Sequence, residues 1–141
     1  MGGILPDETR TKEPVNDPEV QLKTMLEAAG LNGFETERPI PISGGIVTRP
    51  DVYFHEPNDQ YSGVCVYLDG MSRHIHGNSE TASRDRVIRD ELRNKDFEVV
   101  EIMYQQLFDK VSMRLHMRKI AKAVMGIAKA RDIEADDSWF S

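Results

Sequence analysis

Apolar residues recur at helical spacing in three stretches of the chain. The first covers residues 18–30, where Asp17 can act as the N-cap and Gly30 ends the pattern. The second spans about residues 81–95 and the third about residues 106–130. We expect these helices to bury Leu22, Met25, Leu26, Ala29, Val87, Ile88, Leu92, Met113, Met117, Ile120, Val124 and Ile127.

Short runs rich in β-branched and aromatic residues separate the helical patterns and predict strands. Residues 38–42 contain two prolines, so they fit only an edge strand. Residues 46–54 predict a longer strand, and the continuous apolar run 64–68 is typical of a buried central strand. The intervening residues 55–63 form the loop of a hairpin, and residues 97–102 form a second buried strand.

The order of these elements predicts an α/β (α+β) fold. The hairpin pairs its two strands antiparallel, whereas the passage from strand 64–68 through a helix to strand 97–102 implies a right-handed crossover and a parallel pair. We therefore expect a mixed sheet flanked by helices.

The chain has 141 residues, which suffice for one domain with a hydrophobic core. Residues 1–16 lack periodicity and predict an arm or linker, residues 17–131 the domain, and residues 132–141 an acidic and aromatic tail. Cys65 is the only cysteine, so intrachain disulfides and multi-cysteine zinc sites are excluded. Its valine neighbours indicate a small core residue.

The balance of 18 basic and 24 acidic residues gives a formal net charge of -6, so any contact with DNA must be local. No apolar run approaches the roughly 20 residues needed to span a bilayer. The first residues lack the features of a secretory signal, and we expect a cytoplasmic protein with no membrane partner.

Two aspartates flank the predicted hairpin. Asp51 falls in the first strand and Asp69 ends the next, so antiparallel pairing can bring both carboxylates to one sheet edge. Two such carboxylates suit Mg²⁺. The alternative interpretation is that each aspartate serves a turn.

His74 and His76 alternate around one residue, close after Asp69 in the sequence. An extended backbone would place both imidazoles on one side. A histidine, with a pKa of about 6.5, can act there as a general base. The alternative is a solvated loop pair.

The segments RPDVYF at residues 49–54 and VCVYLDGMSRH at residues 64–74 resemble the very-short-patch-repair type of restriction-endonuclease-like domain, within the PD-(D/E)XK nuclease superfamily. Similar domains occur at the C-termini of some superfamily 2 helicases. The resemblance covers about residues 17–105. It implies a mixed sheet of about four or five strands flanked by helices, and magnesium-dependent cleavage of DNA phosphodiesters.

The resemblance also implies roles for individual residues. Asp51 would bind Mg²⁺ or Mn²⁺, and Asp69 would take the second active-site position with the Leu68 carbonyl as an extra ligand. Glu19 would reach the site from the first helix, and His74 would be the base.

His76 would contact the scissile phosphate, and Arg73 beside the site is a further predicted DNA contact. Tyr67 stands where many relatives have Glu, and the family's lysine is absent, although the repair-endonuclease branch also lacks that Glu.

A row of basic residues recurs every four positions in the last predicted helix: Lys110, Arg114, Arg118 and Lys122. Such a row can follow DNA phosphates, or it can be an ordinary solvated helix face.

The leading hypothesis is a metal-dependent DNA endonuclease in repair or defence. The alternative is a catalytically degenerate module that binds DNA or a protein partner, such as the terminal domain of a helicase. A third hypothesis is an interaction protein that uses the methionine-rich last helix and the Trp139–Phe140 tail. The oligomeric state stays open.

Overall fold

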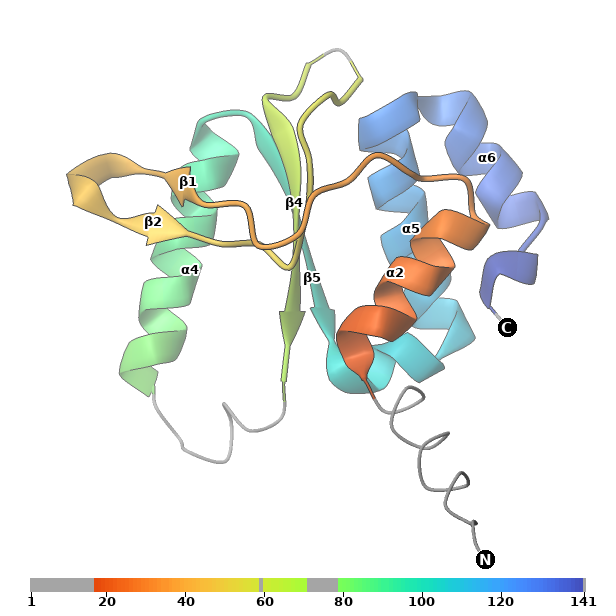
Figure 1. The fold of residues 1–141 in the computed structure, drawn as a ribbon, viewed down its shortest axis with the longest axis horizontal. Coiled ribbons are helices and arrows are strands. Elements are labelled where there is room, and N and C mark those ends of the chain that lie inside the picture. The colour runs from red at the N-terminus through yellow and green to blue at the C-terminus, as the bar shows by residue number, and fades with distance from the viewer. Residues whose placement is uncertain (1–16, 59, 71–78, 141) are drawn as a thin grey trace, which may run out of the picture.

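The computed structural model describes residues 17–58, 60–70 and 79–140 (Figure 1). Its central sheet has the order β3-β4-β5, formed by β3 (Val52–Phe54), β4 (Gly63–Asp69) and β5 (Phe97–Met103). β3 pairs antiparallel with β4, in the register Val52 to Val66. β4 pairs parallel with β5 along its whole length. The mixed sheet predicted from the element order is therefore confirmed.

The remaining strands form a separate ribbon. β1 (Ile40–Pro41) and β2 (Val47–Thr48) pair antiparallel, with Ile40 opposite Thr48. The strand expected over residues 46–54 is thus split between ribbon and sheet, and the break falls at residues 49–51, which include Pro50. Proline lacks the N–H that a continuing ladder requires. The expected count of four or five strands in one sheet is not confirmed among the described residues.

Two helices match the sequence patterns closely. α2 (Pro18–Ala28) is capped by the Asp17 carboxylate, which accepts a hydrogen bond of 3.0 Å from the Glu19 N–H. Its chain turns at Gly30, where φ is +82°. α4 (Ser79–Asn94) forms the crossover between β4 and β5. Val87 on this helix is 64% exposed, so its expected burial is wrong, whereas Leu92 is fully buried.

The last predicted helix is divided in two. After a 3₁₀ helix, η3 (Tyr104–Phe108), come α5 (Lys110–Met125) and α6 (Ile127–Ala135), with Gly126 between them at φ +103°. That backbone conformation ends a helix and is readily adopted by glycine. The axis of α6 differs from that of α5, so Ile127 does not continue the buried face of α5 and is 41% exposed.

The C-terminal residues are part of the main core. α6 continues past the expected domain boundary at residue 131, and a final 3₁₀ helix, η4 (Ser138–Phe140), follows it. The indole of Trp139 is only 4% exposed, and its Nε1–H donates a hydrogen bond of 3.2 Å to the Ile133 carbonyl. This anchor holds the end of the chain against α2.

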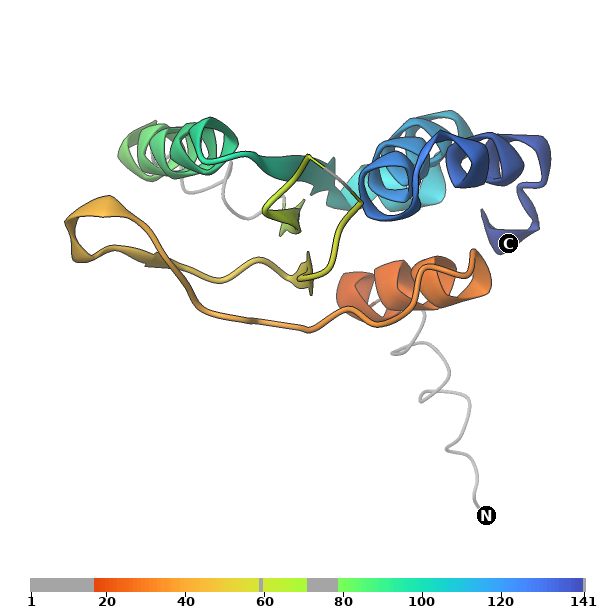
Figure 2. The ribbon, with the colours of Figure 1, turned by 90° about the horizontal axis from the view of Figure 1, so that it is seen from above.

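The sheet lies between two layers, as the view along the strands shows (Figure 2). α2, α5 and α6 pack on one face, against Val64, Val66 and Leu68 of β4. α4 and the ribbon cover the other face, against Cys65 and Tyr67. Burial raises the pKa of Cys65 to about 12, as expected of a core residue.

Within the described ranges, no helix combines the length and the apolar character needed to cross a membrane.

Candidate metal site

Asp51 is fixed at the end of the central hairpin. It directly precedes β3, and its Oδ2 accepts a hydrogen bond of 2.7 Å from the Leu68 N–H. The antiparallel pairing thus holds the Asp51 carboxylate against the last residues of β4.

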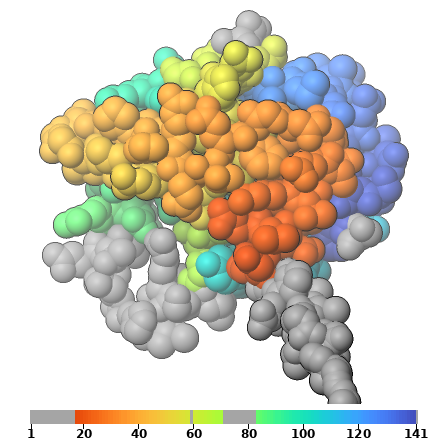
Figure 3. Space-filling model, in the orientation of Figure 1, coloured from red at the N-terminus to blue at the C-terminus, as the bar shows by residue number. Residues whose placement is uncertain are grey.

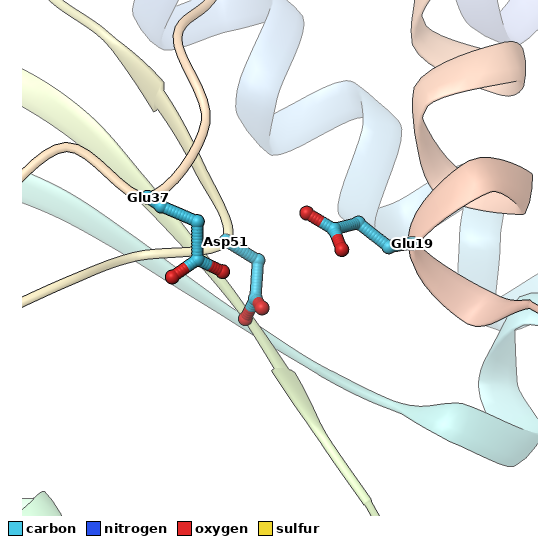
Figure 4. Close-up of side chains that lie close together, drawn as sticks. All are labelled: Glu19, Glu37 and Asp51. Carbon is cyan, nitrogen blue, oxygen red and sulfur yellow. The ribbon is translucent and has the colours of Figure 1, made fainter.

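Two further carboxylates converge on Asp51. Glu19 extends from the first turn of α2, and Glu37 comes from the segment before β1 (Figure 4). One oxygen of each acid lies within 4.8 Å of one oxygen of the other two. We refer to Glu19, Glu37 and Asp51 as the carboxylate cluster.

Glu37 was absent from the sequence prediction. It is exposed, precedes an Arg-Pro pair and lies in no periodic pattern. A long-range backbone contact brings it to the site, because the Glu37 N–H donates a hydrogen bond of 3.2 Å to the Pro50 carbonyl. The segment that carries it runs across the front of the molecule beside α2 (Figure 3).

The electrostatics of the cluster disfavour three negative charges. Burial raises the pKa of Asp51 from its ordinary value of 3.8, and the charges of Glu37, Glu19 and Asp69 raise it further, against the lowering by the Leu68 N–H. Lys23 lies 3.4 Å from Glu19. Among the described residues, no Lys or Arg forms a salt bridge with Asp51 or Glu37.

Asp69 has a different partner. Both of its oxygens accept hydrogen bonds from Arg89 of α4, at 2.9 and 3.0 Å. Arg89 also donates to Glu101 at 2.8 Å and stacks 4.0 Å over the ring of Tyr67. The structure therefore joins Asp51 with Glu19 and places Asp69 in a second group of charges.

Two members of this second group are buried or nearly so. The side chain of Arg89 is only 7% exposed and that of Asp69 is 15% exposed. Burial alone would lower the pKa of Arg89, but the hydrogen bonds that it donates to Asp69 and Glu101 raise it above its ordinary value. The Tyr67 hydroxyl forms a hydrogen bond of 2.7 Å with the Thr48 hydroxyl. Burial raises the pKa of Tyr67 to about 12. We call Arg89, Asp69, Glu101 and Tyr67 the arginine cluster.

His74, His76 and Arg73 lie outside the described residues, which end at Gly70 and resume at Ser79. Their assigned roles stay predictions, as does the role of the Leu68 carbonyl.

The basic row of α5 is largely engaged within the molecule. Lys110 lies 3.2 Å from Asp137, and Arg118 lies 3.1 Å from Glu134. Arg114 donates a hydrogen bond of 3.2 Å to the Glu134 carbonyl. In the part of the chain that the structure describes, Lys122 forms no salt bridge.

The donor set of the carboxylate cluster fits a hard divalent cation. Carboxylate oxygens are the ligands that Mg²⁺ and Mn²⁺ prefer, and the cluster contains no sulfur or nitrogen donor. Among the described residues, Lys23 is the one cation that pairs with this group of three acids, and a bound divalent cation would stabilise such a group.

Comparison of the chain with protein-family models, with curated proteins and with solved structures gave no match.

Proposed function

We propose that the protein is a metal-dependent DNA endonuclease whose cation binds at the carboxylate cluster. The convergence of Glu19, Glu37 and Asp51 from three separate segments is the observation that carries this proposal. It gives the site a carboxylate from α2, as the resemblance implies for Glu19. Glu37 supplies a third acid although position 67 is a tyrosine.

Each residue then has a defined task. The Leu68 N–H orients the Asp51 carboxylate, and Glu19 and Glu37 complete the oxygen ligands. A bound Mg²⁺ would polarise the phosphodiester and activate water. His74 is proposed to take up the proton of the attacking water, and Asp69 keeps β4 and α4 together through Arg89.

Nicking of supercoiled plasmid in Mg²⁺ or Mn²⁺ tests the proposal. Asp51→Ala should reduce the rate by more than about 100-fold, because changes even in the shell around metal ligands cost about 10- to 100-fold. Glu35→Gln is the matched control, since Glu35 lies two residues from Glu37 but pairs with Arg38 at 2.8 Å. Equal nicking by Asp51→Ala and the parent protein would refute the proposal.

The second candidate function is a catalytically degenerate module that binds DNA or a protein such as a helicase. The arginine cluster favours it, because Asp69 is engaged by Arg89 and Tyr67 occupies the acid position. This module would bind DNA in the presence of EDTA and would nick no plasmid with either cation. Metal-dependent nicking that Asp51→Ala abolishes would exclude it.

A further inference from the structure

The C-terminal residues bring acidic side chains onto the basic row of α5. Asp137 reaches Lys110, the first member of the row, and Glu134 reaches Arg118, the third. The carbonyl of Glu134 accepts a hydrogen bond from Arg114, the second. Three of the four members of the basic row are therefore occupied from one direction, by residues 134–137.

The acidic residues are held in place by the core rather than by their charges alone. Trp139 follows Asp137 by two residues and is almost completely buried among the residues of α2, α5 and α6. Phe140 packs beside it, with the Lys110 ammonium 6.0 Å from its ring. Figure 1 shows the chain turning back beneath α6 toward α2 at this point.

The ion pairs themselves are exposed. The Lys110 and Asp137 side chains are 52% and 36% exposed, and those of Arg118 and Glu134 are 40% and 42% exposed. Exposed pairs of this kind contribute little to the free energy of folding. Their position therefore calls for an explanation other than stability.

We infer that the acidic residues Glu134 and Asp137, anchored by Trp139, compete with nucleic-acid phosphates for the basic row of α5 and so limit its affinity for DNA. This inference rests on the proposed DNA binding but not on catalysis. Because the buried Trp139 indole holds residues 134–137 in place, the negative charges of Glu134 and Asp137 oppose phosphate binding without the segment having to leave α5. Lys122 has no salt bridge within the described residues and can make an initial phosphate contact.

The test removes the two charges and keeps the anchor. Glu134→Gln combined with Asp137→Asn leaves the shape of the segment and Trp139 unchanged. Binding of a short fluorescein-labelled DNA duplex is followed by anisotropy in EDTA, so that the carboxylate cluster plays no part. The control is Asp90→Asn with Asp96→Asn, which removes two charges from α4 and the turn after it, on the other face of the sheet.

The inference predicts that the Glu134→Gln, Asp137→Asn variant binds DNA on the order of tenfold more tightly than the parent. Two freed cations should also steepen the plot of log K against log salt by about 1.8, since each neutralised phosphate adds about 0.9. The control should change neither quantity appreciably. Adding Lys110→Gln and Arg118→Gln to the acidic variant should abolish the gain.

Trp139 is the only tryptophan, so its fluorescence reports on the anchor directly. We expect the same emission maximum in the parent, the variant and the DNA complex. An equal gain in affinity for variant and control would overturn the inference, because net charge alone would then explain it. So would unchanged affinity of the variant, or no DNA binding by any form. Plasmid nicking by the parent protein decides the proposed function separately.

Discussion

Two groups of acidic side chains lie near the end of β4, and they are balanced in opposite ways. In the arginine cluster, Asp69 and Glu101 share the guanidinium of Arg89, and Glu101 also lies 3.4 Å from Arg93. In the carboxylate cluster, Lys23 pairs with Glu19, and no Lys or Arg of the described residues forms a salt bridge with Asp51 or Glu37. Within the part of the chain that the structure describes, acidic side chains are thus neutralised on the α4 side and left with excess negative charge on the α2 side.

The difference separates a structural role from a binding role. A buried charge is tolerated when it is paired and hydrogen-bonded, as Asp69 is. A crowded group of acids instead costs stability and is maintained where a cation can bind. Asp69 is thus engaged by Arg89, whereas the pKa of Asp51 is raised by burial and by its acidic neighbours, which fits the ligand role that we propose for it.

Removing the central cation of the arginine cluster should have the largest effect. Arg89→Met breaks the buried ion pair between Arg89 and Asp69, a change that typically costs about 3–5 kcal/mol of unfolding free energy, while the exposed Glu101 keeps Arg93. Urea unfolding followed by circular dichroism measures this cost. Arg93→Met is the control, since its side chain is 42% exposed, and it should cost less than about 1 kcal/mol. Similar losses for both variants would mean that the two arginines are equivalent.

The second-largest expected effect is the pH dependence of cation binding at the carboxylate cluster. The pKa of Asp51 is raised above its ordinary 3.8, so Asp51 holds a proton at pH values where exposed aspartates are ionised. A cation must displace this proton, and its affinity should fall by up to about tenfold per pH unit as the pH drops through the raised pKa. Mn²⁺ titrations at a series of pH values measure the slope. A constant affinity down to pH 3.8 would contradict the raised pKa.

The raised pKa of Asp51 also determines how the stability of the fold changes with pH. Between the ordinary and the raised pKa, the native protein binds more protons at Asp51 than the unfolded chain does. The stability contributed by this residue therefore increases as the pH falls through the raised pKa, and at neutral pH the ionised carboxylate is destabilising.

The smallest effect concerns stability at neutral pH. Asp51→Asn removes a charge from the crowded cluster and keeps an oxygen for the Leu68 N–H, so it should raise the unfolding free energy by up to about 1 kcal/mol. Asp69→Asn, which weakens a charge-assisted pair, should lower it by about 1–3 kcal/mol. Thermal unfolding of the two variants compares them. A loss of stability in Asp51→Asn would show that the cluster is not under electrostatic strain.

Local sequence signals predicted much of the fold. The Asp17 cap, the apolar run of β4 and the crossover through α4 were readable from spacing and residue type, and the structure confirms them. The split between α5 and α6 depends on the backbone at Gly126, which a helical pattern that continues on both sides does not reveal.

The candidate site was predicted only in part, because its remaining members depend on tertiary contacts. Asp51 and Glu19 came from the hairpin and from the family resemblance. Glu37 is positioned by the hydrogen bond from its N–H to the Pro50 carbonyl. Asp69 accepts hydrogen bonds from Arg89, which lies 20 residues further along the chain. Neither contact has a signature in the sequence. The engagement of the basic row by residues 134–137 was missed for the same reason.

Calorimetric titration of Mg²⁺ and Mn²⁺ tests the central claim most directly, with the parent protein, Glu37→Gln and Glu35→Gln compared under the same conditions. Both glutamates come from the same segment, but only Glu37 belongs to the carboxylate cluster, since Glu35 pairs with Arg38. We predict that the parent and Glu35→Gln bind the cation and that Glu37→Gln binds it at least about tenfold more weakly. Equal binding by all three proteins, or no binding by the parent, would contradict the assignment of the cluster as a metal site.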